Sequence, residues 1–122
     1  MRHVVRRPLA PRSPEETKPL TEPVLLILMS LADQPRHGYA LLKNIESISQ
    51  GRVRLSTGTL YEALRRLLAD ASIERFQQQD TSREKQAYKL TGAGHARLRQ
   101  ELGRMHQLTE TAARLRLIEE MP

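Results

Sequence analysis

Two short segments of this chain carry side chains whose types and spacing could bind a polyanion. The first is Pro35-Arg36-His37-Gly38-Tyr39, and the second is Ser56-Thr57-Gly58-Thr59-Leu60-Tyr61 with its continuation to Leu64. The second segment opens with the hydroxyls of Ser56, Thr57 and Thr59. At the start of a helix, hydroxyls, free backbone N–H groups and the helix dipole together favour a phosphate. The pattern therefore predicts a helix whose first turn meets a nucleic acid backbone.

Further candidate contacts follow along the same predicted helix and beside it. Tyr61 lies one turn in and can offer its hydroxyl to a phosphate or a base edge, and Arg65 lies one turn further, within reach of guanine O6 and N7. Tyr39, near the start of the preceding helix, could contact the flanking phosphate. Arg83 and Lys85 lie on a predicted hairpin that would follow the minor groove or the backbone. Such contacts would give an affinity that falls steeply with salt.

Each of these residues also has a purely structural interpretation. The hydroxyls at the start of the helix could be a helix cap and nothing more. Both tyrosines could be core aromatics, Tyr61 less so because it falls beside the leucine stripe of its helix. Arg65 could lie on a solvated face and pair with Glu62, and charged hairpin tips are common on any surface. The prediction of DNA binding rests on the convergence of these groups on one side of the molecule.

Hydrophobic spacing and helix caps predict the elements that must position these groups. In chain order they are a helix from the cap Thr21 to Asp33, a helix over 37–49, a helix from the cap Ser56 to Asp70, strands over 73–78 and 85–90, and a helix of about 25 residues from the cap Thr91. The helix over 37–49 is expected to bury Tyr39, Leu42, Ile45 and Ile48, and the next helix Leu60, Leu64, Leu67 and Leu68. This order predicts a mainly α fold with a small β-hairpin wing, a winged helix-turn-helix followed by a long C-terminal helix.

Several motifs resemble the PadR family of bacterial transcriptional regulators. They are Leu28 to Leu31, His37-Gly38-Tyr39, Gly58-Thr59-Leu60-Tyr61, Leu64 with Arg66-Leu67, and Tyr88-Lys89-Leu90-Thr91 with Gly94. The resemblance covers roughly residues 21 to 100. It implies a DNA-binding winged-helix domain, a single C-terminal helix used for homodimerisation, and repression that a small effector usually relieves.

The chain departs from the family pattern at the wing. Ala71 and Ser72 stand where a glycine and an apolar residue usually close the third helix, so a left-handed helix end there would be strained or replaced. Gln86 and Ala87 stand at commonly basic and aromatic positions. Phe76 is predicted to compensate by pairing with Tyr88 across the hairpin. The long helix is not expected to form an aromatic stacking pocket for an effector, because the one Phe and the three Tyr all lie elsewhere in the chain.

The predicted organisation has three parts. Residues 1–20 read as a flexible, basic, Pro-rich arm, residues 21–90 as the winged helix-turn-helix domain, and residues 91–122 as the dimerisation helix. The dimer stripe is predicted to consist of Leu98, Leu102, Met105, Leu108, Ala112, Leu115 and Ile118.

The composition limits the classes of function that this chain could have. The 122 residues carry a formal net charge of +6 with a sequence pI near 10.3, which suits a polyanionic partner. No cysteine is present and the four histidines are scattered, so no metal or cofactor is expected. The longest apolar run, Val24 to Met29, is too short to span a bilayer, and a cytoplasmic protein is expected. Paired carboxylates and nucleophile–base pairs at catalytic spacing are absent, so an enzyme is not expected.

These observations predict a homodimeric DNA-binding regulator, a repressor that reads an inverted-repeat operator and responds to an effector. The alternative is a winged-helix protein-interaction module without specific DNA binding, which would use the third helix and the C-terminal helix to dock a partner protein.

Overall fold

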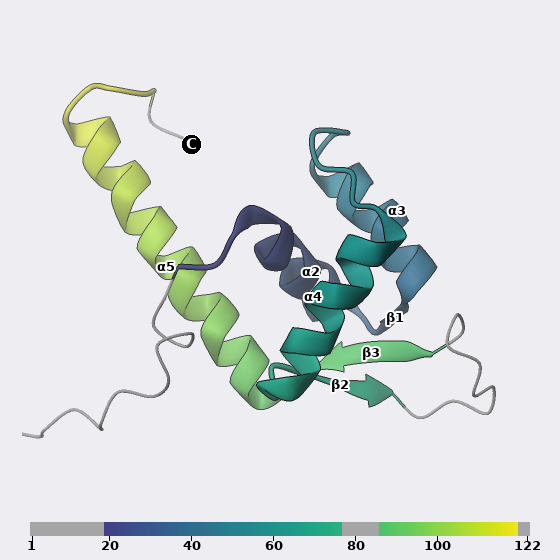
Figure 1. Ribbon diagram of the computed structural model, residues 1–122. Coiled ribbons are helices and arrows are strands. Elements are labelled where there is room, and N and C mark those ends of the chain that lie inside the picture. The colour runs from purple at the N-terminus through teal and green to yellow at the C-terminus, as the bar shows by residue number, and fades with distance from the viewer. Residues whose placement is uncertain (1–18, 77–85, 120–122) are drawn as a thin grey trace, which may run out of the picture.

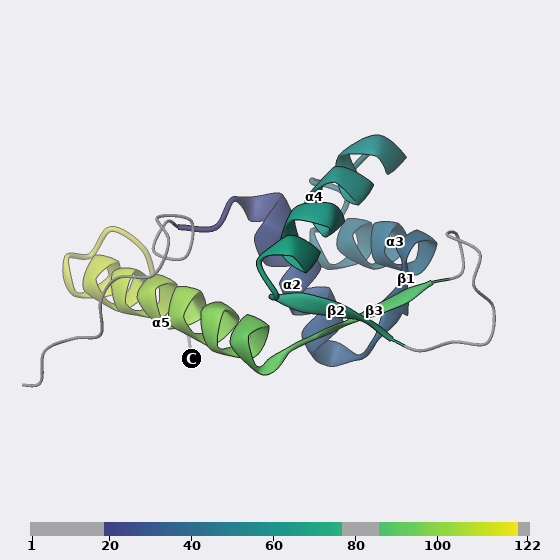
Figure 2. The same ribbon diagram turned by 60° about the horizontal axis from the view of Figure 1, so that its bottom comes forward.

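The computed structural model describes residues 19–76 and 86–119. Within these ranges the elements are α2 (Glu22–Asp33), β1 (Arg36–His37), α3 (Gly38–Ile48), α4 (Thr57–Ala69), β2 (Ile73–Phe76), β3 (Ala87–Leu90) and α5 (Gly92–Arg114). Helices α2, α3 and α4 lie together beside the small sheet, and α5 projects away from them (Figures 1 and 2). The predicted mainly α winged-helix fold with a long C-terminal helix is confirmed.

Side-chain caps start three of the helices where the sequence predicted them. The hydroxyl of Thr21 accepts the N–H of Val24 at 3.4 Å, and Ser56 accepts that of Thr59 at 3.1 Å. Thr91 accepts the N–H of Gly94 at 3.0 Å. Each cap satisfies one of the backbone donors that the first turn of a helix leaves without an intrahelical partner, so α2, α4 and α5 begin at fixed residues.

The core gathers around α2, which is apolar on most of its surface and contacts α3, the sheet and α5. Its buried apolar side chains come from Leu25, Leu26, Ile27, Leu28, Leu31, Leu41, Ile45, Leu60, Leu64, Leu67, Ile73, Tyr88, Leu90 and Leu98. The predicted leucine face of α4 is confirmed: Leu60, Leu64 and Leu67 are buried and Leu68 packs against them.

The predicted buried stripe of α3 is wrong at Tyr39 and Ile48, whereas Ile45 is buried as predicted and Leu42 is partly buried against the core. Tyr39 is 67% exposed and Ile48 is 43% exposed, whereas Leu41 and Ile45 are fully buried. The sequence of α3 offers two overlapping apolar stripes one residue apart. Packing of α3 against both α2 and α4 buries the stripe that includes Leu41, and this turns Tyr39 toward solvent.

The sheet has the order β1-β3-β2, with both pairs antiparallel. β1 was not predicted, because two residues cannot display a strand period; Arg36 holds it in place by donating from Nε to the Ser30 carbonyl at 3.0 Å. The predicted pairing of Phe76 with Tyr88 is wrong, since the register sets Phe76 opposite Ala87 and Arg75 opposite Tyr88. The Phe76 ring instead faces the Lys89 ammonium, 5.6 Å from its centroid.

The end of α4 has the strained geometry that the sequence predicted. Ala71 has a φ of 65°, in the left-handed region that favours glycine. The N–H of Ser72 donates to the Leu67 carbonyl at 2.9 Å, which completes a helix end of the Schellman type, and Asp70 Oδ1 accepts the same N–H at 3.0 Å. The turn therefore keeps the usual hydrogen bonds of a helix end despite carrying an alanine.

This turn is joined directly to the first turns of α5. The Thr91 hydroxyl donates to the Ala71 carbonyl at 2.6 Å. Arg97 Nη1 lies 3.0 Å from Asp70 Oδ2 and 2.9 Å from Ser72 Oγ. A Cβ built at Gly94 would stand 2.0 Å from the Ser72 carbonyl oxygen, so the backbones touch at this point. The direction of α5 is consequently fixed relative to the end of α4.

Most of α5 lies beyond the core. Leu98 is 5% exposed and packs inside the domain, whereas Leu102 and Leu108 are 37% and 57% exposed. The helix ends at Arg114, earlier than predicted, so Leu115 is its C-cap residue and Ile118 lies past its end. Arg116, with a φ of 63°, turns the chain there. In the part of the chain that the structure describes, no helix is both long and apolar enough to cross a membrane.

Candidate nucleic-acid interface

The first turn of α4 is exposed on the side away from its leucines. Thr57, Gly58 and Thr59 are all exposed. The Ser56 hydroxyl caps the helix and also donates to Thr59 Oγ1 at 3.0 Å, so these two side chains hold each other in place. The structure thus brings the predicted hydroxyls together at the helix start, where the positive end of the dipole and outward-facing N–H groups could receive an anion.

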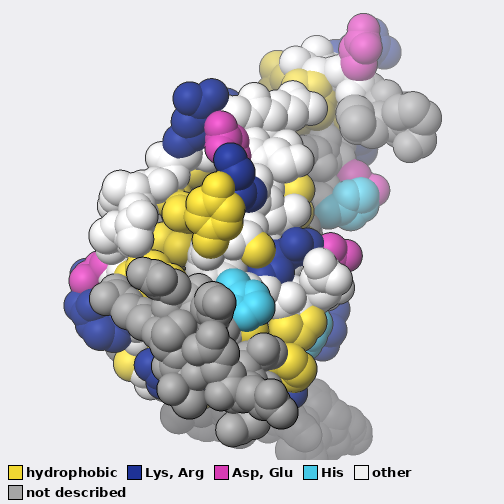
Figure 3. Space-filling view, turned by 90° about the vertical axis from the view of Figure 1, so that its right-hand side faces the viewer, with side chains coloured by type: hydrophobic (Ala, Val, Ile, Leu, Met, Phe, Trp, Pro, Cys, Tyr) yellow, Lys and Arg dark blue, Asp and Glu magenta, His cyan; other side chains and the backbone are white. Residues whose placement is uncertain are grey.

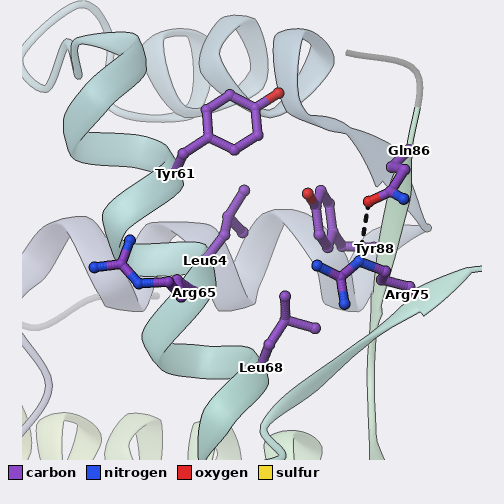
Figure 4. A pocket seen from close by; sticks show the side chains of 7 residues that line it. All are labelled: Tyr61, Leu64, Arg65, Leu68, Arg75, Gln86 and Tyr88. Carbon is purple, nitrogen blue, oxygen red and sulfur yellow. Dashed lines mark hydrogen bonds between the residues drawn. The ribbon is translucent and has the colours of Figure 1, made fainter. Parts of the chain in front are cut away.

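Tyr61 is half-buried and lies against the start of α3. A Cβ built at Gly38 would stand 2.3 Å from the Tyr61 hydroxyl oxygen and 2.9 Å from the ring carbon that bears it. Figure 4 shows the ring projecting from α4 with its hydroxyl directed toward α3. The first role of Tyr61 is therefore to join the two helices of the helix-turn-helix.

Arg65 and Arg66 share one carboxylate on the exposed face of α4. Arg65 Nη2 lies 2.5 Å from Glu62 Oε1, and Arg66 Nε lies 3.5 Å from Glu62 Oε2. The hydrogen bond from Arg65 lowers the pKa of Glu62, and the charge of Arg65 adds to the effect. Both arginines are more than two-thirds exposed, so the pairs are weak and could be exchanged for an external phosphate or base.

Tyr39 belongs to the surface of α3 and not to the core. The Lys43 ammonium lies 5.8 Å from the centroid of its ring, one turn along the helix. Figure 3, which views the side that carries α3 and β1, shows basic side chains interspersed with hydrophobic and acidic ones instead of one continuous basic patch. A ligand on this side would be recognised through contacts with individual side chains as well as through electrostatic attraction.

The loop between α3 and α4 carries two arginines that the sequence analysis did not single out. Arg52 Nη1 donates to Glu22 Oε1 at 2.9 Å, and this hydrogen bond lowers the pKa of Glu22. Arg54 Nε lies 3.1 Å from Glu46 Oε2 with 73% of its side chain exposed. The sequence signal that could have identified these two arginines is their placement at alternate positions just before the helix cap Ser56. The arm residues 1–18 and the wing residues Arg83 and Lys85 lie outside the described residues.

A groove separates α4 from the sheet on the same side as Arg65. It has a volume of about 240 Å³ and is lined by Tyr61, Leu64, Arg65, Leu68, Arg75, Gln86 and Tyr88 (Figure 4). The lining combines an apolar floor with basic and hydroxyl groups, and none of the described residues that line it carries a carboxylate.

Three packed helices, the second and third forming a helix-turn-helix, and a small antiparallel sheet define a winged-helix protein. Comparison with known families identifies the family of winged-helix proteins to which the chain belongs. Residues 27–100 match the model of the transcriptional regulator PadR-like family, and the chain belongs to this family. It is a family of transcriptional regulators, and nothing in the match points to catalysis.

The chain is similar to several individual proteins. It is 38% identical over 85 residues to an uncharacterized 37.1 kDa protein in transposon TN4556 of Streptomyces fradiae; the match covers 70% of this chain but 23% of that protein. The structure of a PadR family transcription regulator from Clostridium difficile R20291 superposes with a TM-score of 0.63 at 21% identity, covering 78% of this chain and 98% of the other.

Two further structures have the same fold. A PadR-like transcription factor from Bacteroides fragilis has a TM-score of 0.63 at 25% identity, covering 75% of this chain and 87% of the other. Bacillus subtilis PadR in complex with operator DNA has a TM-score of 0.56 at 24% identity, covering 65% of this chain and 45% of the other.

Proposed function

We propose that this chain is a sequence-specific DNA-binding regulator that acts in the cytoplasm as a homodimeric repressor of an inverted-repeat operator. The observation that carries the proposal is α4, which buries three leucines on one face and exposes a hydroxyl-bearing first turn and Arg65 on the other. A helix anchored in this way can enter a major groove without losing its packing. The structure of Bacillus subtilis PadR with operator DNA supports the same use of the fold.

Each predicted contact has a distinct part in this proposal. Ser56, Thr57 and Thr59 bind a phosphate at the helix start and set the register of the protein on the duplex. Arg65 exchanges Glu62 for guanine O6 and N7, and Tyr39 contacts the flanking phosphate beside Lys43. The hydroxyl of Tyr61 contacts a phosphate or a base edge at the margin of the interface. Arg83 and Lys85 on the wing, and the basic arm over residues 1–20, add backbone or minor-groove contacts.

The exposed part of α5 provides the surface for dimerisation. Leu98 packs inside the domain, and Met105 also packs against the core. The surface left for a second copy consists of Leu102, Leu108, Ala112, Leu115 and Ile118. Two-fold pairing through it would place two α4 helices in successive major grooves, about 34 Å apart.

An effector that relieves repression completes the proposal, as the family resemblance implies. A hollow of about 420 Å³ lies beside the last turns of α5, lined by residues that include His106, Glu110 and Arg114. Its lining combines charged and hydroxyl groups with the apolar Ala113 and Ile118, which suits a molecule with both polar and apolar parts.

Selection from a randomised DNA pool, combined with analytical ultracentrifugation, tests the proposal. The expected result is a dimer that enriches a palindrome. Arg65→Ala should weaken binding to that palindrome and relax the base preference at one position of each half-site. Arg99→Ala on α5 is the matched control, because Arg99 is exposed and lies outside the interface. A monomer that enriches no sequence would instead support the winged-helix protein-interaction module.

Deletion of residues 1–18 tests the arm separately, because it retains Leu20, which packs against the core. The shortened chain should bind with lower affinity and a shallower dependence on salt, while its sequence preference stays the same. An unchanged salt dependence would remove the arm from the interface.

A further inference from the structure

The groove between α4 and the sheet has a polarity suited to an anion that carries apolar carbon. Leu64, Leu68 and the ring of Tyr88 lie at its base, and Arg75 and Gln86 lie on the sheet side (Figure 4). Tyr61 and Arg65 belong both to this groove and to the exposed side of α4. The groove is therefore continuous with the proposed DNA-binding face.

Arg75 supplies the charge on the sheet side. Its Nε donates to Gln86 Oε1 at 2.9 Å, across the two strands. Among the residues that the structure describes, none forms a hydrogen bond or ion pair with its two Nη groups, and the side chain is exposed. A guanidinium that is held through Nε and open at both Nη groups is pre-oriented to donate to a phosphate.

Gln86 supplies a neutral hydrogen-bond acceptor beside Arg75. A lysine or arginine at this position could not accept the Nε–H of Arg75 and would repel the guanidinium. In this chain the positive charge is on Arg75, and Gln86 supplies the acceptor that orients it.

With α4 in a major groove, one strand of the duplex would run alongside the helix, and the groove between α4 and the sheet could receive it. Phosphates of that strand would lie near Arg75, and its deoxyribose carbons would face Leu64 and Leu68. Among the described lining residues there are two arginines and no acidic residue, which favours this occupant.

We propose that the groove is a phosphodiester site in which Arg75, oriented by Gln86, binds the DNA backbone beside the recognition helix. The inference rests on the proposed function and extends it to two residues with no previous role. Arg75 makes the contact, and Gln86 is a positioning residue.

Binding of the wild-type chain, Arg75→Gln and Gln86→Leu to two duplexes of equal length tests this assignment. One duplex is the sequence enriched from the randomised pool, and the other is unrelated. Arg75→Gln should weaken binding to both by the same factor, about tenfold, because a phosphate contact carries no sequence information. It should also reduce the slope of log affinity against log salt by about 0.9. Gln86→Leu should weaken binding while retaining the slope, because the charge remains.

Arg99→Gln, with the same change of charge on α5, is the control. Equal losses for Arg75→Gln and Arg99→Gln would overturn the site while leaving the proposed function intact. A wild-type chain that binds neither duplex would overturn the proposed function itself.

The NMR signal of the Arg75 Nε–H separates DNA from a free anion. It should shift on addition of duplex and stay in place with inorganic phosphate at matched ionic strength. A saturable shift with inorganic phosphate alone would assign the groove to a small anion and overturn the DNA assignment.

Discussion

The hydroxyl of Tyr61 occupies the space that a side chain at Gly38 would need, 2.3 Å from the position of its Cβ. Gly38 is the first residue of α3, and Tyr61 lies in the second turn of α4. The contact fixes the start of one helix of the helix-turn-helix against the other. It also explains structurally why a glycine and a tyrosine stand at these two positions.

Gly38→Ala should destabilise the fold by about 1–3 kcal/mol, because the new methyl group forces the Tyr61 ring out of its place. Urea unfolding followed by circular dichroism measures the loss. Gly58→Ala is the matched control, since a Cβ there meets nothing within 4 Å. That substitution should instead stabilise the fold by about 0.5–1 kcal/mol. Equal effects at both positions would argue against the steric role of Tyr61.

Ala71→Gly should stabilise the fold by about 1 kcal/mol. Ala71 has a φ of 65°, which glycine adopts without the steric cost of a Cβ. Gly51, with a φ of 80°, provides the reverse experiment at the end of α3, where Gly51→Ala should lose a similar amount. The free energies of unfolding of both variants test the pair. A loss of stability in Ala71→Gly would mean that the left-handed turn carries no strain.

Glu101 should contribute stability that depends on pH. Its side chain is 8% exposed, and Arg104 Nη2 lies 2.6 Å from its carboxylate. The hydrogen bond from Arg104 lowers the pKa of Glu101, with a further contribution from the backbone N–H of Leu20. A carboxylate whose folded pKa is lowered contributes fully above its unfolded value, about 4.3, and the contribution is lost as the pH falls through the folded pKa.

Glu101→Gln should therefore unfold at lower urea concentration than the wild type at pH 7, and the difference should shrink below about pH 4. Glu110→Gln, at a carboxylate that is 60% exposed, is the control. A difference between Glu101→Gln and the wild type that is equally large at pH 3 and pH 7 would exclude the charge of Glu101 as its cause.

Glu62→Gln should raise the affinity for DNA several-fold and steepen the salt dependence. The carboxylate holds Arg65 and Arg66 in the free protein and would repel phosphates in the complex. Glu110→Gln changes the charge by the same amount on α5 and should have a smaller effect. Fluorescence anisotropy at several salt concentrations measures both. Lower affinity in Glu62→Gln would mean that Glu62 positions Arg65 for binding.

Two leucines of α5 should respond differently to truncation. Leu98→Ala should destabilise the fold by about 2–5 kcal/mol, because Leu98 is 5% exposed within the core. Leu108→Ala, at a residue that is 57% exposed, should weaken the dimer while the secondary structure stays intact. Sedimentation velocity and circular dichroism on both variants separate the effects. A Leu108→Ala dimer as tight as the wild type would place the dimer surface elsewhere.

The sequence by itself determined the elements whose signals are local. The hydroxyls of Thr21, Ser56 and Thr91 mark helix starts because a side chain there reaches a backbone N–H three residues away. The leucine spacing of α4 identified its buried face because a single strong apolar stripe leaves one choice. The strain at Ala71 also followed from the residue type at a helix end.

Only the tertiary structure decided matters that depend on neighbours distant in sequence. Packing against two other helices, not hydrophobicity, turned Tyr39 outward and buried Leu41. Strand register placed Arg75, and not Phe76, opposite Tyr88, and so created the pair with Gln86. The hydroxyl-bearing turn that first suggested DNA binding could be predicted from the sequence. The groove beside it could not, because its walls come from α4 and the sheet, and local sequence patterns do not connect these segments.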